Sequence, residues 1–175
     1  MPQHREQAFL TACDQICKLA GATLESRLSS MEEELDARLP HDSSNLMMTW
    51  EHVRDLTRHG HIIGSHTMTH PNMAYLGCED ATREFADSKK CIEEQINAPV
   101  EHFAYPCPAL YPSWTEQTVE HSRITGYQAA VTTSPGVVRN GHNPLRLSRV
   151  RPTKTVAGLR WNLEKAFAVR NAEKP

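Results

Sequence analysis

Apolar residues recur at helical spacing through the first 40 residues of the chain. They are Phe9, Leu10, Cys13, Ile16, Cys17 and Leu19 in segment 5–20, and Leu24, Leu28, Met31, Leu35 and Leu39 in segment 23–39. Spacings of three and four place each set on one face of a helix. Gly21 and Pro40 are stop signals. The pattern predicts a helical hairpin over residues 1–45, with the polar segment 40–45 as a linker.

After residue 45, short apolar runs alternate with amphipathic segments. The predicted strands are 61–65, 100–105, 127–133 and 145–150, and the predicted helices are 50–59, 79–96, 114–125 and 155–172. Strands separated by helices of this length pair in parallel through right-handed crossovers. The sequence therefore predicts an α/β domain over residues 46–175. Its functional groups should lie at the carboxyl ends of the strands.

That rule singles out two of the ten histidines. His66 directly follows the predicted strand 61–65, and His70 comes four residues later. If residues 66–70 make one helical turn, both imidazoles lie on the same face. Neutral imidazole is a ligand for zinc and related divalent ions. The pair is therefore a predicted metal site, and two surface-loop histidines are the alternative interpretation.

Cys107 follows the predicted strand 100–105 at the same edge. Its thiolate is a candidate third ligand, while a buried reduced thiol is the alternative. His61 and His102 begin their strands, so they lie at the opposite edge. A strand of five residues spans about 16 Å, and neither side chain can reach an ion bound by His66.

The bulk composition removes several classes of partner. The formal net charge is −2 and the pI is about 6.5, so no basic field would attract nucleic acid or an acidic membrane. No apolar run is long enough to span a bilayer, and no apolar core follows the N-terminus. We expect the chain as written to be cytoplasmic, unless its true start lies upstream.

Two short motifs carry a family resemblance. Residues 60–72 read Gly-His-Ile-Ile-Gly-Ser-His-Thr-Met-Thr-His-Pro-Asn, and residues 103–106 read Phe-Ala-Tyr-Pro. Together with the helix between them, they resemble the second and third motifs of the polysaccharide deacetylases, the NodB-like carbohydrate esterase family 4. The likeness covers about residues 46–152. It implies a distorted (β/α) barrel and a hydrolase that removes acetyl groups from N-acetylated carbohydrate.

The resemblance also implies roles for particular residues. His66 and His70 would bind a divalent metal ion, with zinc as the first candidate. The backbone N–H of Tyr105 would lie at the oxyanion position, and its ring would line the substrate groove; a core aromatic is the alternative. In the family an Asp completes the metal site, a neighbouring Asp is the general base, and a late His protonates the leaving amine.

The chain departs from the family pattern at these last positions. No Asp-Asp dipeptide occurs, and residues 149–151 read Arg-Val-Arg where the late His is expected. We therefore expect an incomplete barrel of doubtful activity, preceded by the helical hairpin. A missing N-terminal segment or a partner chain would supply the first strand. The alternatives are a non-catalytic carbohydrate-binding relic and a scaffold protein that associates through the hairpin.

Overall fold

The computed structural model describes residues 2–36, 47–107 and 111–172. The helices in these ranges are α1 (Pro2–Ile16), α2 (Gly21–Glu34), α3 (Trp50–Arg58), α4 (Cys78–Ile96), α5 (Glu116–Ile124) and α6 (Val156–Ala172). The strands are β1 (His102–Ala104), β2 (Ala129–Pro135) and β3 (Leu147–Arg149), and the 3-10 helices are η1 (Met73–Tyr75) and η2 (Pro144–Arg146). Every helix expected after residue 45 is present, with its ends shifted by no more than two residues.

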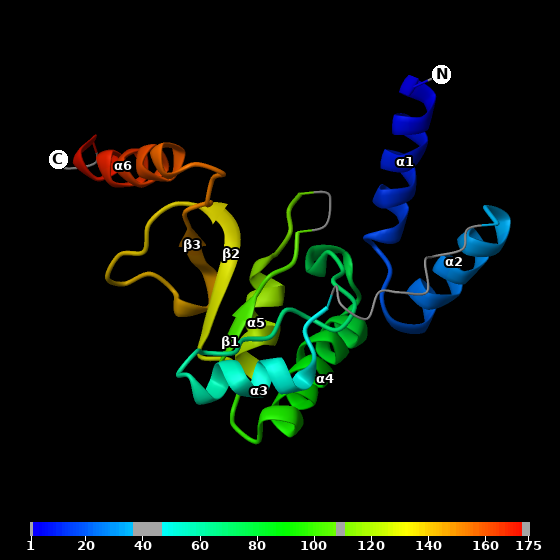
Figure 1. The fold of residues 1–175 in the computed structure, drawn as a ribbon, viewed down its shortest axis with the longest axis horizontal. Coiled ribbons are helices and arrows are strands. Elements are labelled where there is room, and N and C mark those ends of the chain that lie inside the picture. The colour runs from blue at the N-terminus through cyan, green and yellow to red at the C-terminus, as the bar shows by residue number, and fades with distance from the viewer. Residues whose placement is uncertain (1, 37–46, 108–110, 173–175) are drawn as a thin grey trace.

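The strands form one small parallel sheet in the order β1-β2-β3 (Figure 1). Phe103 lies opposite Ala130, and Val131 lies opposite Leu147. The prediction of parallel pairing is confirmed by both registers. The strands run parallel because α5 connects β1 to β2 and returns the chain to the same end of the sheet. The result is an α/β fold in which the carboxyl ends of the strands share one edge.

The predicted strand 61–65 is reduced to a single bridge. Ser65 pairs with Phe103: the Ser65 N–H donates to the His102 carbonyl at 2.9 Å, and the Ala104 N–H donates to the Ser65 carbonyl at 2.9 Å. Ile62, in contrast, is 75% exposed. The apolar run at 61–63 therefore has no second layer to pack on, and the ladder does not extend along it.

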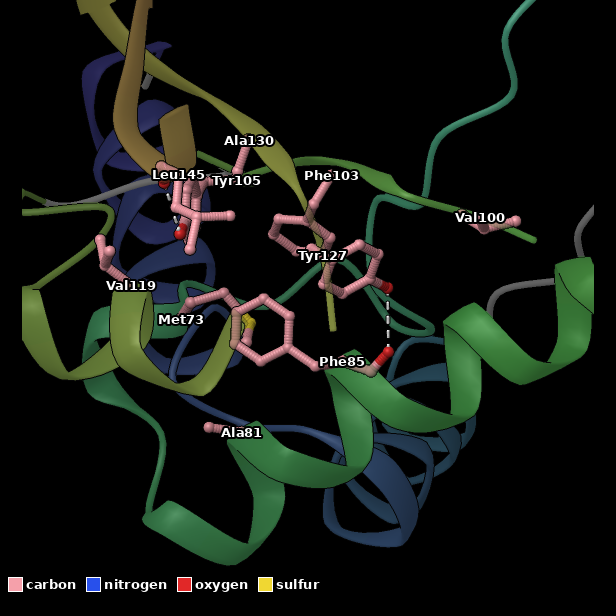
Figure 2. Packing of buried hydrophobic residues seen from close by; sticks show 10 residues of the cluster. All are labelled: Met73, Ala81, Phe85, Val100, Phe103, Tyr105, Val119, Tyr127, Ala130 and Leu145. Carbon is pink, nitrogen blue, oxygen red and sulfur yellow. Dashed lines mark hydrogen bonds between the residues drawn. The ribbon is translucent and has the colours of Figure 1, made fainter. Parts of the chain in front are cut away.

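The core lies between α4, α5 and the sheet. Its buried members are Met73, Ala81, Phe85, Val100, Phe103, Tyr105, Val119, Tyr127, Ala130 and Leu145 (Figure 2). The Phe85 ring, from α4, is fully buried, and its centroid lies 4.6 Å from that of Phe103. The Tyr127 hydroxyl donates to the Phe85 carbonyl at 3.0 Å, so this buried phenol keeps a hydrogen bond.

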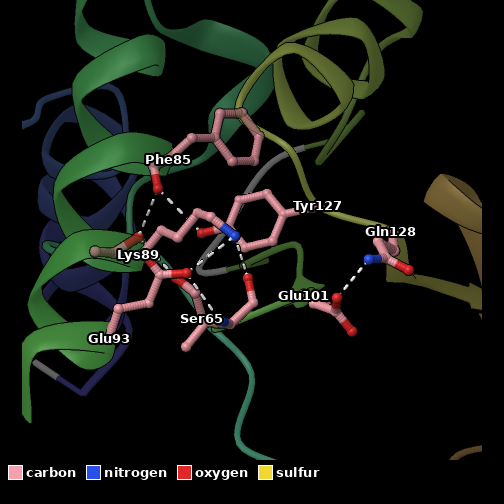
Figure 3. A network of polar contacts seen from close by, with 9 residues as sticks. Ser65, Phe85, Lys89, Glu93, Glu101, Tyr127 and Gln128 are labelled. Carbon is pink, nitrogen blue, oxygen red and sulfur yellow. Dashed lines mark hydrogen bonds and ion pairs between the residues drawn. The ribbon is translucent and has the colours of Figure 1, made fainter. Parts of the chain in front are cut away.

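Lys89 connects α4 to the amino end of β1 (Figure 3). Its ammonium donates to the Val100 carbonyl, lies 3.3 Å from a Glu93 carboxylate oxygen and lies 4.9 Å from the centroid of the Tyr127 ring. The Glu93 carboxylate also accepts from the Val100 N–H at 2.9 Å. The charge of Lys89 is therefore satisfied, at the end of the sheet opposite His66.

The two N-terminal helices occupy the predicted segments but begin and end earlier. Both α1 and α6 extend away from the sheet (Figure 1), and their apolar residues Phe9 and Trp161 are 66% and 67% exposed. The predicted linker 40–45 lies outside the described residues. No helix among the described residues has the length and apolar character needed to cross a membrane.

Candidate metal centre

The structure brings His66 and His70 together after Ser65. Their ring centroids lie 4.8 Å apart, with the ring planes at 78°. Nδ1 of His66 lies 2.7 Å from the carbonyl oxygen of Ala104. Because a carbonyl only accepts, Nδ1 carries the proton and Nε2 keeps its lone pair. Histidines that bind metals are commonly oriented by such a bond.

His70 is held toward its neutral form. Burial, and then the nearby His66, lower the pKa of its imidazole below the usual value. Metal ions bind the neutral ring, so the surroundings of His70 favour the form that coordinates.

The loop that carries the histidines is not the helical turn that we expected. Thr67 and His70 have φ angles of +73° and +57°, in the left-handed region that side chains disfavour. The Thr67 hydroxyl stabilises this path, because it donates to the His66 carbonyl and accepts from the His70 N–H, the latter at 3.1 Å. The side chains meet through this reversal of the chain instead of through an i, i+4 helical spacing.

Glu84, on α4, holds the histidine loop through hydrogen bonds and is called the Glu84 clamp below. Its carboxylate accepts hydrogen bonds from the N–H groups of Met68 and Thr69, at 2.7 and 3.1 Å, and from the Thr69 hydroxyl at 2.5 Å. Glu84 is only 4% exposed. Sequence reasoning missed this residue, although an acid beside Phe85 on the inward face of a helix was the available signal.

Tyr105 occupies a different place from the one expected. Its ring is fully buried in the core, so the predicted position in a substrate groove is wrong. Its hydroxyl donates to the Leu145 carbonyl at 3.0 Å and lies 3.1 Å from Ser122 Oγ. Its N–H donates to the Val131 carbonyl at 3.0 Å within the sheet. The oxyanion role of this N–H stays a prediction, and the sheet hydrogen bond argues against it.

Cys107 lies just beyond β1, at the edge where it was expected. Within the described ranges, no three His, Cys, Asp or Glu side chains group closely enough to hold a metal ion. The structure therefore brings together His66 and His70, and the role of Cys107 as a third ligand stays a prediction.

The turn between α1 and α2 covers one side of the histidine loop. The Asn72 N–H donates to the Cys17 carbonyl at 2.9 Å. A cavity of about 170 Å³ lies here, lined by Cys13, Cys17 and Leu24 from the N-terminal helices and by His70 and Pro71 from the loop. Burial, and then Asp14, raise the pKa of the Cys17 thiol, so this sulfur stays protonated and apolar.

We expect the stability of the fold to decline between about pH 10 and pH 12 through Tyr105. Burial raises the pKa of its phenol to about 12, whereas the unfolded phenol titrates near 10. In this window the unfolded chain releases a proton that the folded chain retains, so unfolding becomes more favourable as the pH rises. Urea unfolding at several pH values, for wild type and Tyr105→Phe, measures the contribution.

The Tyr105→Phe variant should be about 1 kcal/mol less stable at pH 8, because it loses the hydroxyl contacts. This deficit should shrink as the pH rises through the window, since phenylalanine does not ionise. A deficit that stays constant up to pH 12 would contradict the expectation.

Comparisons with known proteins identify the family. The sequence model of the family described as polysaccharide deacetylase matches residues 30–130, more than half of the chain. The protein YxkH of Bacillus subtilis strain 168, which is named as a polysaccharide deacetylase, is 31% identical over 111 residues. This match covers 63% of the present chain and 38% of YxkH. The chain belongs to the polysaccharide deacetylase family, as its two motifs indicated.

Solved structures show the same fold. The deacetylase PplD of Streptococcus pyogenes, determined in complex with acetate, superposes with a TM-score of 0.59 at 24% identity, over 68% of this chain and 50% of that one. BC0361, a polysaccharide deacetylase of Bacillus cereus, gives a TM-score of 0.56 at 24% identity, over 66% of this chain and 36% of that one. The chain therefore spans half or less of the length of these relatives.

Proposed function

We propose that this chain is the histidine-bearing part of a metal-dependent hydrolase that removes acetyl groups from N-acetylated carbohydrate. The observation that supports this most directly is the His66–His70 pair, held by the Ala104 carbonyl and by the Glu84 clamp. On this proposal residues 46–175 form a partial, distorted (β/α) barrel of the NodB type. Residues 1–45 are a helical extension or insertion.

The donor set fits a divalent ion, with zinc as the first candidate. Nε2 of His66 has a free lone pair, and His70 is biased toward the neutral ring. A bound ion would polarise the amide carbonyl and lower the pKa of an attacking water. The work of this chain is to fix the His66 tautomer through Ala104 and to hold the loop through Glu84.

The family's Asp ligand and Asp base have no counterpart in this chain, which contains no Asp-Asp dipeptide. We place both on an additional N-terminal segment or on a partner chain that would add a strand beside residues 61–65. Two features support this position. Ile62 is 75% exposed there, and the pairing of this segment stops at Ser65. A catalytic zinc usually has three protein ligands and a water, which two histidines do not supply.

Zinc titration of the purified chain tests the metal site. We expect one zinc per chain in wild type and a loss of more than about 100-fold in affinity for His66→Ala and for His70→Ala, beyond the loss typical of changes around the ligands. His61→Ala is the matched control, because His61 lies at the opposite edge. Equal binding by His66→Ala and His61→Ala would contradict the site.

A second candidate function is carbohydrate binding without turnover. The same absence of an acidic pair that makes catalysis depend on another segment favours it. The two functions are distinguished by incubating N-acetylglucosamine oligomers with the zinc-loaded chain in the presence of the segment or partner chain that would supply the acidic pair. Acetate release that disappears in His66→Ala supports the hydrolase, whereas saturable binding with no acetate supports the binding function.

A further inference from the structure

A second cavity lies at the same edge of the sheet as the histidine pair. Its volume is about 560 Å³, and it is lined by Pro135 at the end of β2, by Val150 just after β3 and by residues of α6. Asn162 of α6 donates to the Arg151 carbonyl at 3.1 Å, which ties the helix to the segment that follows β3. The cavity is therefore bounded by the sheet edge on one side and by the C-terminal helix on the other.

The wall of this cavity is basic. Arg139, Arg151 and Lys165 line it together with His142, and no Asp or Glu of the described residues takes part. The charged residues of the surrounding sequence are also almost all basic. From residue 122 to residue 163 there is no acidic residue, and the basic ones are Arg123, Arg139, Arg146, Arg149, Arg151, Lys154 and Arg160. Since the whole chain has a net charge of −2, positive charge is concentrated at this end of the molecule.

Two cations of the cavity, Arg151 and Lys165, differ from nearby arginines in that they have no ion-pair partner among the described residues. Arg146, Arg123 and Arg160 each form an ion pair, with Glu116, Glu120 and Glu164 respectively. Across the part of the chain that the structure describes, neither Arg151 nor Lys165 is ion-paired. Arg151 and Lys165 thus keep positive charge that no carboxylate of the described residues neutralises, next to the apolar side chains of Val137 and Val150.

We propose that this cavity binds an anionic group of an acidic carbohydrate, a carboxylate or a phosphate or sulfate ester. The inference rests on the proposed function for its choice of carbohydrate. Guanidinium groups bind such oxyanions through paired N–H donors, and the ammonium of Lys165 adds a second charge. The ligand is then a polymer in which acidic units accompany N-acetylated ones.

The topology sets the minimum length of that ligand. The order of the strands places segment 61–65, β1, β2 and β3 side by side. The cavity is therefore two to three strand spacings from the histidine pair, which is about 10 to 15 Å. One sugar cannot occupy both places, so the substrate is an oligosaccharide that runs along the carboxyl edge of the sheet.

Calorimetric titration with a hexamer of galacturonic acid, a neutral hexamer of glucose and inorganic phosphate tests the inference on the full chain. We expect the acidic hexamer to bind, with affinity that falls as salt rises, and the neutral hexamer to bind at least tenfold more weakly. The double variant Arg151→Gln/Lys165→Gln should lose at least about tenfold in affinity for the acidic hexamer. Lys154→Gln, which removes one charge from the same segment but lies outside the cavity, should change it less than threefold.

Equal binding of the two hexamers would overturn the inference, and so would an equal loss in Lys154→Gln and the double variant. Binding of phosphate with no binding of the acidic hexamer would show a small-anion site and would also overturn it. The His66→Ala variant separates this inference from the proposed function. It should lose zinc and still bind the acidic hexamer like wild type, so either property can fail while the other is retained.

Discussion

Replacing Phe85 by alanine should destabilise the fold by about 3–5 kcal/mol, the range measured for buried phenylalanines. The ring is fully buried and lies within 4.6 Å of Phe103, 6.1 Å of Tyr127 and 6.3 Å of Tyr105, measured between centroids. Its removal opens a cavity at the point where α4 meets the sheet. Small domains are stable by only about 5–15 kcal/mol, so this single change removes a large share. Urea unfolding followed by circular dichroism measures it.

Two control variants, Phe9→Ala and Phe85→Leu, test whether the loss comes from the buried ring. Phe9→Ala removes the same ring from a position in α1 that is 66% exposed, and it should cost less than about 0.5 kcal/mol. Phe85→Leu retains most of the buried apolar volume and should fall between the two. If Phe85→Ala and Phe9→Ala unfolded at the same urea concentration, the core described for α4 would be wrong.

Glu84→Ala should weaken zinc binding by about 10- to 100-fold without removing any ligand. The carboxylate accepts three hydrogen bonds from Met68 and Thr69, and these fix a loop that contains two left-handed residues. Without the clamp the loop has several paths, and only some of them bring the two imidazoles together. The free energy of unfolding should also fall by about 2–4 kcal/mol, because two partly buried N–H groups lose a charged acceptor.

The design of this experiment separates positioning from a general loss of structure. Glu94→Ala is the control, since Glu94 lies on the same helix with its side chain 63% exposed. Glu84→Gln keeps one carbonyl acceptor and should recover part of the zinc affinity. A Glu84→Ala variant that unfolds early but binds zinc with wild-type affinity would show that the residue is only structural.

The helices and the parallel order of the strands could be predicted because their signals are local. Thr49 begins α3 with a capping box in which His52 is the reciprocal partner, and a turn with Gly60 at φ +81° follows the helix. The prediction of a strand at 61–65 failed because pairing depends on contacts that are not local. Its apolar run looks like a strand, but a ladder needs a partner strand along its whole length, and that partner is not encoded in the run itself.

The candidate site was predicted in part. His66 and His70 could be found because they follow an apolar run and match a motif. The left-handed loop and the Glu84 clamp depend on contacts across 14 or more residues of sequence, which spacing does not reveal. Tyr105 was assigned to the groove because residues 103–106 resemble the third motif of the family. The structure turns its ring inward, where hydrogen bonds to Ser122 and Leu145 satisfy the hydroxyl.

Glu84 and Phe85 are consecutive residues of α4, so one turn of this helix serves both the histidine loop and the core. Ligand that binds only the folded loop must then stabilise the helix as well, by about 2.7 kcal/mol at a zinc concentration 100 times the dissociation constant. The thermodynamic linkage should be visible as protection from proteolysis. With zinc present, proteolytic cleavage within α4 should slow down. Without zinc, α4 should unfold locally before the strands of the sheet lose their pairing.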